Sequence, residues 1–286
     1  MPGPRIAIAT CAGYDDLKVD DELLRAALGE RGAEAASVVW DAENRDWSGF
    51  DLCLVRSTWD YHEKYDRFLD WTRQVAAATA LRNPAETVAW NSDKTYLRGL
   101  GEQGVRIVPT VWAKRETEAD LDQILAEREW DEGVVKPVVD LGAKNLRRVQ
   151  RGGGSSALEE VLRHHDAMVQ PFLPSLQEEG ELSLIFIAGE LSHVVRKRPA
   201  AGDFRVQSIW GGTVAPAEPE AAQVELAQEA LGQLDAVPLY ARVDLVRGLD
   251  GEPCLIELEL IEPNLYLSTH PGAADRLADA VTALLR

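Results

Sequence analysis

Residues 240–264 read YARVDLVRGLDGEPCLIELELIEPN, two apolar stretches separated by a turn and carrying several acidic residues. The turn RGLDGEP predicts a β-hairpin, with Arg242 and Asp244 on its first strand and Glu257 and Glu259 on its second. Because successive side chains of a strand point to opposite faces, Glu257 and Glu259 share one face. Carboxylates gathered in this way can hold Mg²⁺ against a polyphosphate, and their burial without a cation is costly. An exposed acidic hairpin is the alternative, since the chain is acidic throughout.

The composition is that of an ordinary soluble protein with an acidic surface. The chain has 286 residues, 45% of them hydrophobic, and a formal net charge of −18. Its length allows two or three lobes. The charge repels nucleic acid and anionic lipid, and no apolar run approaches membrane-spanning length, so we expect a small-molecule partner and no nucleic acid or membrane. Three scattered cysteines predict neither disulfides nor a zinc site, and we expect a cytoplasmic location. A homodimer is left open.

Strands and helices alternate along the chain and divide it into three segments. Residues 1–91 open with a strand, helix, strand pattern. Residues 92–173 continue the alternation and end in the strand AMVQPFL. Residues 174–286 are rich in strands and contain the acidic hairpin, with a preceding hairpin that turns at Ala188 and Gly189. The predicted fold class is therefore α/β and α+β.

Three motifs in the middle segment suit a nucleotide. In VVKP, Lys136 projects from a strand end and could bind phosphate oxygens, although a surface lysine is the alternative. In RGGGS, Gly152 to Gly154 offer unobstructed backbone N–H groups for a flap over phosphates, or form a plain hairpin turn. The stretch MVQPFL suits an adenine slot, with backbone groups of Pro171 and Leu173 at the edge of the base, or is a core strand.

A basic segment stands out in the last third of the chain. RKR followed by GDFRV carries Arg196, Lys197, Arg198 and Arg205, which we expect on adjacent strands. Concentrated positive charge in an acidic protein indicates a site for an anion.

Substrate selection is expected where the strands of the first segment end, because ligands of open α/β sheets collect there. Arg56, Ser57, Thr58 and Asp60 follow such a strand. Arg56 could clamp a carboxylate with two hydrogen bonds and Asp60 could receive an ammonium group. Alternatively, Arg56 and Asp60 pair with each other and Trp59 fills a core. The candidates for the remaining pocket wall are Asn264, Tyr266, Ser268 and His270, with His193 a further residue near the site.

Taken in order, these motifs resemble the ATP-grasp superfamily. The similar parts are the lysine before a helix, Lys-Pro on a strand, the glycine-rich turn, VQPFL followed by GELS, GDFRVQ with GG, and then ARVDL and IELEL, over residues 93–264. The segments GDFR and RVDL are most similar to the glutathione-synthetase and ribosomal-protein glutamate-ligase branch. The whole chain, with IATC and VRSTWDYH, resembles the cyclo-ligases of cycloserine biosynthesis, which close O-ureido-serine to an isoxazolidinone ring.

The resemblance implies an ATP-grasp fold in which two lobes, residues 92–173 and 174–286, grip ATP. A Rossmann-like lobe, residues 1–91, would help to form the substrate pocket. ATP and Mg²⁺ are the implied cofactors. The metal ligands carried over by position are Asp244, Glu257 and Glu259. Related ligases commonly have Asn where Glu259 stands, so Asn264 remains an alternative third ligand. The implied ATP-binding residues are Lys94, Lys136, Gly152, Gly153, Gly154, Gln170, Pro171, Phe172, Leu173 and, at the ribose, Glu181.

The implied chemistry transfers the γ-phosphoryl group of ATP to a carboxylate and lets a nitrogen attack the resulting acyl phosphate. Mg²⁺ and positively charged side chains would stabilise the charge that develops. We assign Lys197 to the γ-phosphate and Arg205 to the acyl phosphate and tetrahedral oxyanion, with Arg242 in reserve.

Three functions are compatible with these residues. The first is an ADP-forming carboxylate–nitrogen ligase that cyclises one amino-acid substrate, so that tethering replaces a second binding event. The second is an intermolecular amino-acid or peptide ligase. The third is a nucleotide-binding regulatory module or kinase. The complete set of acidic and basic residues favours a ligase.

Overall fold

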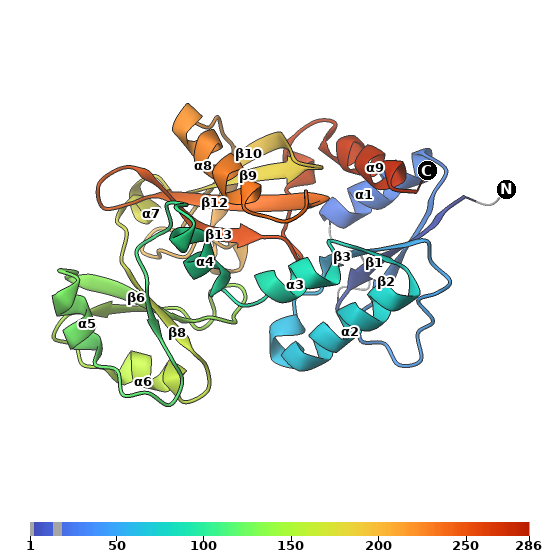
Figure 1. Cartoon of the computed structure of the whole chain (residues 1–286). Helices are drawn as coiled ribbons and strands as arrows, with labels where there is room; N and C mark the ends of the chain where they lie inside the picture. Colours follow the sequence, from blue (N-terminus) through green and yellow to red (C-terminus); the bar gives the residue numbers. More distant parts are fainter. Residues whose placement is uncertain (1–2, 14–18, 286) are drawn as a thin grey trace.

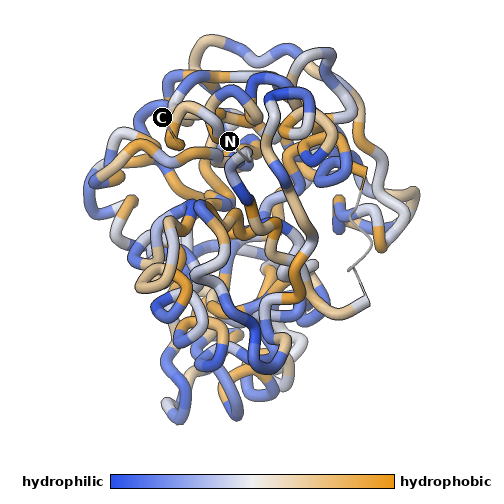
Figure 2. Tube along the Cα trace, turned by 90° about the vertical axis from the view of Figure 1, so that its right-hand side faces the viewer, coloured by the Kyte–Doolittle hydropathy of each residue, from blue (hydrophilic) through white to orange (hydrophobic). Residues whose placement is uncertain are grey.

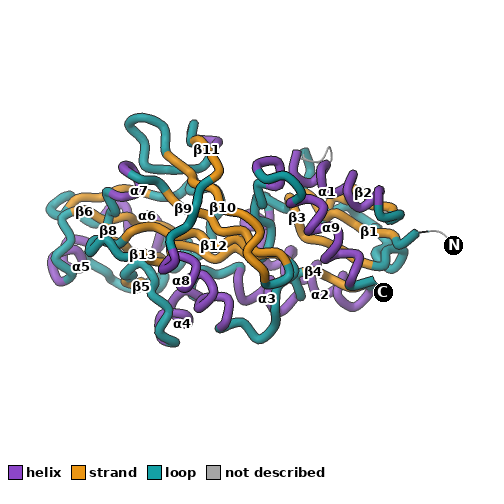
Figure 3. The backbone as a smooth tube through the Cα atoms, turned by 90° about the horizontal axis from the view of Figure 1, so that it is seen from above, coloured by secondary structure: helices purple, strands orange, loops and turns teal. Residues whose placement is uncertain are grey.

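The computed structural model describes residues 3–13 and 19–285, which form three β-sheets with helices packed against them (Figure 1). Seen from above, the N-terminal sheet lies at one end, the sheet containing β9, β10 and β12 in the middle, and β6 and β8 at the other end (Figure 3). Hydrophobic residues occur in short stretches throughout the trace, without one continuous apolar run (Figure 2). The N-terminal and third sheets share one hydrophobic cluster, which includes Ile6, Leu54 and Ile185.

The N-terminal sheet is parallel, in the order β2-β1-β3-β4. Helix α2 packs on one face with an aromatic core that includes Trp40, Phe68 and Trp71, and α1 covers the other face. The predicted strand, helix, strand opening is therefore confirmed. The bounds are β1 Arg5–Thr10, α1 Val19–Glu30, β2 Glu34–Val39, β3 Leu52–Ser57, η1 Tyr61–Lys64, α2 Tyr65–Ala78, β4 Ala80–Arg82 and α3 Ala85–Asn91.

The second sheet is antiparallel, in the order β5-β8-β6-β7, and packs its core against α5 and α6. Residues 138–146, here called the cavity loop, connect β6 to β7. The glycine-rich turn follows β7 and lies outside this hairpin, contrary to our expectation. The bounds are α4 Tyr96–Glu102, β5 Val111–Ala113, α5 Leu121–Glu127, β6 Glu132–Pro137, β7 Arg147–Gln150, α6 Ser156–Leu162 and β8 Ala167–Pro171.

The third sheet has the order β11-β10-β9-β12-β13, and all its pairings are antiparallel. The expected hairpins β9–β10 and β12–β13 are both confirmed. Arg205 lies in residues 199–212, here called the basic loop, and not on a strand as predicted. The bounds are α7 Ser175–Glu178, β9 Glu181–Ile187, β10 Glu190–Arg198, η2 Ser208–Trp210, β11 Thr213–Pro216, α8 Ala221–Gly232, β12 Tyr240–Arg247, β13 Pro253–Glu259, η3 Leu267–Thr269 and α9 Ala273–Ala283.

Helices cross between the segments and join the sheets. Helix α4 packs, together with α8, on the third sheet, and the C-terminal helix α9 returns to pack on α1 (Figure 1). Buried amides hold the end of β13 and the residue after it, since Asn91 donates to the carbonyl of Leu258 at 2.8 Å and Asn83 donates to that of Leu260 at 2.7 Å. The last strand is thereby fixed against the N-terminal sheet. Among the helices that the structure describes, none has the length and apolar character needed to cross a bilayer.

Candidate active site

Residues from all three sheets line one cavity of about 770 Å³. It contains most of the predicted site residues, although they lie up to some two hundred positions apart in the chain. Those that line the cavity are Arg56, Asp60, Lys94, Lys136, Gln170, Pro171, Leu173, Glu181, Lys197, Arg205, Arg242, Asp244, Glu257, Glu259, Asn264 and Tyr266. Its size is in the range of pockets for small molecules.

The acidic hairpin places three carboxylates at the centre of this cavity. The register of β12 and β13 sets Asp244 opposite Glu257 and Arg242 opposite Glu259. One carboxylate oxygen from each of Asp244, Glu257 and Glu259 lies within 4.8 Å of the others. Such a set of hard oxygen ligands fits Mg²⁺. The alternative ligand Asn264 uses its side-chain oxygen to accept the Tyr266 N–H at 2.9 Å, so the geometry fits Glu259 better as the third ligand.

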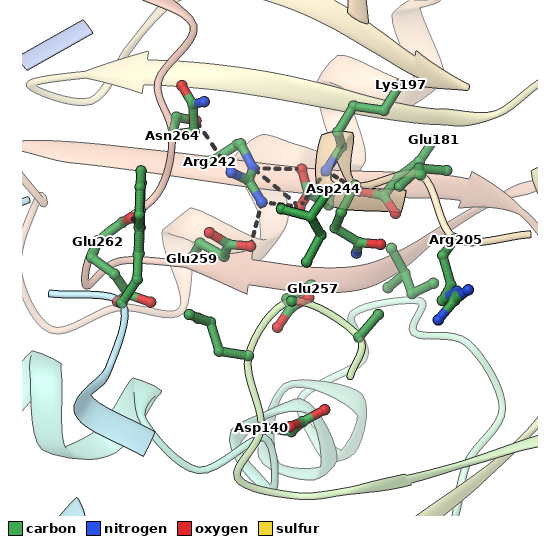
Figure 4. Close-up of a pocket in the computed structure, with 18 of the residues that line it drawn as sticks. Asp140, Glu181, Lys197, Arg205, Arg242, Asp244, Glu257, Glu259, Glu262 and Asn264 are labelled. Carbon is green, nitrogen blue, oxygen red and sulfur yellow. Dashed lines mark hydrogen bonds and ion pairs between the residues drawn. The ribbon is translucent and has the colours of Figure 1, made fainter. Parts of the chain in front are cut away.

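Two cations, Lys197 and Arg242, lie between the carboxylates of Glu181, Asp244 and Glu259 (Figure 4). The Lys197 ammonium lies 3.1 Å from Asp244 and also contacts Glu181, while Arg242 donates to Asp244 at 2.9 Å and also contacts Glu259. Burial raises the pKa of Glu259 to about 7, and the neighbouring carboxylates add to the rise. Asp244 is also buried, yet Arg242 and Lys197 hold its pKa below the ordinary value. The alternation offsets the cost of burying like charges.

The remaining carboxylate of the hairpin faces two lysines. Lys94 lies 3.2 Å from Glu257 and donates to the backbone oxygen of Asp140 at 2.7 Å. Burial of Glu257 opposes its ionisation, but Lys94 and Lys136 outweigh burial and lower its pKa. Burial also lowers the pKa of Lys136, for which no ion pair within 4 Å is found among the described residues. Two ammonium groups therefore border the carboxylate site where phosphate oxygens could be bound.

An apolar wall next to the lysines forms a slot suited to a flat base. Its apolar members are Val108, Val134, Leu146, Leu173, Leu176, Phe204, Val206 and Ile256. Gln170 and Pro171 line it as expected. Phe172 does not line the cavity, because its ring packs 5.8 Å from the Phe204 ring and under the Arg148 guanidinium at 3.6 Å. Of the residues expected at the adenine, Phe172 is therefore outside the cavity lining.

The glycine-rich turn does not reach the cavity. The N–H groups of Gly152 and Gly154 donate to the Asp122 carboxylate at 2.7 and 3.2 Å, so Gly152, Gly153 and Gly154 form a turn against the start of α5. The turn connects β7 to α6, so it is neither the expected flap nor the alternative hairpin turn. The cavity loop lies over the site instead, with Asp140 to Lys144 in the wall. Its signal in the sequence is the polar stretch DLGAKN directly after VVKPVV.

Arg205 lies in the cavity wall but is already engaged. Its Nε and Nη2 atoms donate to Asp203 at 3.1 and 2.7 Å, and its guanidinium lies 3.5 Å from the centre of the Trp210 ring. The Trp210 indole N–H in turn donates to the carbonyl of Gly142 at 2.9 Å. The basic loop and the cavity loop are thus joined directly across the site.

The strand end of β3 forms the opposite wall, with contacts that differ from those expected. Arg56 donates from Nε to Asp21 and from Nη2 to the carbonyl of Pro263, both at 2.9 Å, so it cannot clamp a carboxylate through two nitrogens. Ser57 donates to the same Asp21, and neither Ser57 nor Thr58 lines the cavity. These two residues are therefore not in position to contact a ligand, contrary to expectation.

Asp60 lines the cavity but already has its own cation. Its two oxygens accept hydrogen bonds from Lys64 and from the indole N–H of Trp40, each at 2.7 Å. The expectation that Asp60 receives a substrate ammonium group is wrong, because Lys64 occupies that role. The alternative of an Arg56–Asp60 pair is also not observed.

The wall also contains carboxylates that escaped the sequence analysis, among them Asp20 and Glu262. Asp20, at the start of α1, accepts the Ser268 N–H at 3.2 Å. Glu262 follows β13, and its side chain points into the cavity (Figure 4). Burial raises the Glu262 pKa to about 8, and Glu259 adds to the rise. The acidic pattern of the hairpin continues to Glu262, which was a usable signal. His193 and His270 stack 5.5 Å apart outside the lining of the cavity, whereas Ser268 lines it.

Comparison with known proteins gives a match over nearly the full length and further partial matches. A family model described as the N-terminal domain of D-cycloserine synthetase DcsG matches residues 6–83, and one for the ATP-grasp domain of prokaryotic glutathione synthetase matches residues 106–263. The chain is 31% identical to the cycloserine biosynthesis protein DcsG of Streptomyces lavendulae, over 98% of this chain and 99% of that protein. It is 30% identical to a glutathione synthetase of Prochlorococcus marinus, over 73% of this chain and 65% of that protein.

Solved structures give the same result. The crystal structure of D-cycloserine synthetase DcsG superposes with a TM-score of 0.88 and 30% identity, covering 99% of this chain and all of that one. An ATP-grasp RimK domain protein of Sphaerobacter thermophilus has a TM-score of 0.69 at 18% identity, covering 96% of this chain and 98% of that one, and supports the fold alone.

Proposed function

The chain belongs to the ATP-grasp ligases related to D-cycloserine synthetase DcsG, and from this membership we propose that it cyclises an O-ureido-serine-like amino acid at the expense of ATP. Members of this family are ligases that form C–N bonds. The proposal concerns the substrate, the acyl phosphate intermediate and the residues that act.

The proposed reaction has two steps. An oxygen of the substrate carboxylate attacks the γ-phosphorus of ATP, and the bond to the β-phosphate oxygen breaks to give ADP. A nitrogen of the same molecule then attacks the acyl carbon, closes the ring and expels phosphate, while the nitrogen loses its proton. Tethering the nitrogen to the carboxylate removes the need to bind a second substrate.

The residues of the cavity have complementary roles in this proposal. Asp244, Glu257 and Glu259 would hold Mg²⁺, which when bound neutralises charge on the phosphate oxygens. Lys94 and Lys136 bind the phosphates, and the apolar slot beside Gln170 holds the adenine. Lys197, which was expected at the γ-phosphate, is held between Asp244 and Glu181, so that it and Arg242 keep Asp244 ionised for the metal. Arg205 exchanges Asp203 for the acyl phosphate.

One observation carries the proposal. The three hairpin carboxylates and the cations around them lie in a single cavity whose walls come from all three sheets, in a chain similar to DcsG over its full length. A regulatory module that only binds a nucleotide would not need three metal-binding carboxylates beside a cavity wall formed by the N-terminal sheet.

The test is a turnover assay with the pure protein, Mg-ATP and O-ureido-serine, which follows ADP, free phosphate and product mass. We expect stoichiometric ADP and phosphate and a ring-closed product without any added amine. Turnover that appears only with an added amine acceptor would indicate an intermolecular ligase. A stable phosphorylated product would indicate a kinase.

A further inference from the structure

The wall of the cavity near the N-terminal sheet contains three buried polar side chains that the roles above do not use. Asp20, Arg56 and Glu262 are 8%, 2% and 5% exposed, and all three line the cavity. They come from the start of α1, the end of β3 and the chain after β13.

Arg56 has one nitrogen available and a charge that is already balanced. Asp21 lies 2.9 Å from its Nε, and both side chains are buried. Nη2 is bound to the carbonyl of Pro263, whereas Nη1 is buried with no hydrogen-bond partner in the part of the chain that the structure describes. Since the ion pair with Asp21 is neutral, the free Nη1 donor suits an uncharged acceptor such as a carbonyl oxygen.

Within residues 3–13 and 19–285, no ion pair within 4 Å is found for either carboxylate, that of Asp20 or that of Glu262. Asp20 Oδ2 is buried without a hydrogen-bond partner among the described residues, and no side-chain hydrogen bond or ion pair within 4 Å is found for Glu262 over the same ranges. Contacts from the N-terminal sheet fix the backbone beside Glu262, since Trp59 donates to its carbonyl at 3.1 Å and Arg56 to the next one. Glu262 is therefore held toward the cavity (Figure 4).

The remaining charges near this wall cancel in pairs. Arg56 is paired with Asp21, and Asp60 is paired with Lys64. In this wall the carboxyl groups without an ion pair within 4 Å among the described residues are therefore those of Asp20 and Glu262, and a bound ammonium group would favour their ionised form. Such a wall attracts an ammonium group and repels a carboxylate, because buried charges need a partner of opposite sign.

We propose that Glu262, Asp20 and Arg56 form the subsite for the part of the substrate that does not react with ATP. Glu262 and Asp20 bind an ammonium group, and Arg56 Nη1 donates to a neutral carbonyl oxygen of the ureido or amide type. The substrate class is an amino acid with a single carboxylate, which faces the metal ligands, and amino acids with a second carboxylate such as glutamate are excluded. This inference rests on the proposed function for the identity of the reacting carboxylate.

The test is calorimetric binding to the full-length protein saturated with Mg²⁺ and a non-hydrolysable ATP analogue. The probes are O-ureido-serine, its N-acetyl derivative, which lacks the ammonium group, and glutamate. We expect O-ureido-serine to bind at least tenfold more tightly than either other probe. We also expect Glu262→Gln and Asp20→Asn to weaken O-ureido-serine at least tenfold, and to leave the weak binding of the N-acetyl derivative within twofold of the wild type.

A matched control is Glu86→Gln, which removes a carboxylate from the exposed first turn of α3, outside the cavity. It should leave all three affinities unchanged. Binding of the ATP analogue within twofold of the wild type shows that each variant is folded.

The subsite is overturned if wild-type protein binds none of the probes, if glutamate binds as well as O-ureido-serine, or if Glu262→Gln has no effect. Tight, Glu262-dependent binding without turnover would contradict the proposed function and leave the subsite standing.

Discussion

Individual side chains in the cavity are charged or neutral according to their neighbours. Glu257 is ionised because Lys94 and Lys136 outweigh its burial, whereas at Glu262 burial outweighs the more distant Lys94 and Arg242 and raises the pKa to about 8. The glutamates at positions 257 and 262 are therefore suited to different ligands, although they are close in sequence. Glu257 is suited to bind a metal, and Glu262 is suited to bind a cation brought by the substrate.

Replacing Glu257 tests the metal site. Glu257→Gln removes one of three clustered carboxylate ligands, so we expect turnover to fall by about a hundredfold or more, since bound metal contributes several kcal/mol. ADP release and calorimetric Mn²⁺ binding measure the effect, and circular dichroism reports whether the fold is retained. Near-normal activity in a folded variant would remove Glu257 from the metal site.

Glu262 also predicts a dependence of stability on pH. The Glu262 pKa is raised from 4.5 to about 8 in the folded state. Between these pH values the carboxyl group ionises in the unfolded chain but stays protonated in the folded one, so the folded protein loses stability as the pH rises from about 4.5 to 8. At pH 8.5 we expect Glu262→Gln to raise the free energy of unfolding by on the order of a few kcal/mol. At pH 5 we expect the substitution to change this free energy very little. Denaturant unfolding at both pH values measures this difference. An equal change at both would contradict the assigned pKa.

The two loops over the cavity act as one element in this structure. Trp210 of the basic loop donates its indole N–H to Gly142 of the cavity loop and packs on Arg205. Trp210→Phe keeps an aromatic ring and removes the hydrogen-bond donor. We expect the KM for ATP to rise about fivefold, because this change corresponds to the free energy of one lost hydrogen bond. Trp90→Phe, on the outer side of α3, is the control. An unchanged KM in Trp210→Phe would show that this contact does not hold the loops.

The corrected place of the glycine-rich turn can be tested through Asp122. Its carboxylate accepts the N–H groups of Gly152 and Gly154. Asp122→Ala should lower the free energy of unfolding by about 1 kcal/mol and leave ATP affinity unchanged, because the turn lies outside the cavity. The melting temperature and the Kd for ATP are the two measurements. A lower ATP affinity with unchanged stability would restore the original prediction of a phosphate flap.

Local patterns predicted the elements well where the relevant contacts are close in sequence. The β12–β13 hairpin followed from its turn and alternation, whereas the register shift between Asp244 and Leu245, which sets Asp244 opposite Glu257, did not. Glycines predicted a turn at 152–154, but not which surface the turn faces. The partners of Arg56 and Asp60 could not be predicted, because Pro263 is distant in sequence and Trp40 and Lys64 reach Asp60 only once η1 has folded.

At the scale of the whole molecule, the cavity exists because distant segments are fixed against each other. Asn83 and Asn91 hold the end of β13 and the residue after it, and α9 packs on α1. The carboxylate cluster of the third sheet consequently faces both the lysines of the middle segment and the wall near β3. The alternating order of strands and helices predicted three segments, but not that α4 and α9 would pack against elements of other segments.

The central claim is that these distant groups meet around one Mg-ATP. The most direct measurement is a crystal structure of the protein with Mg²⁺ and a non-hydrolysable ATP analogue. We predict a metal about 2.1 Å from oxygens of Asp244, Glu257 and Glu259. We also predict phosphates contacted by Lys94 and Lys136 and an adenine against the apolar slot. A nucleotide bound elsewhere, or a cavity in which these carboxylates contact neither metal nor phosphate, would contradict the account.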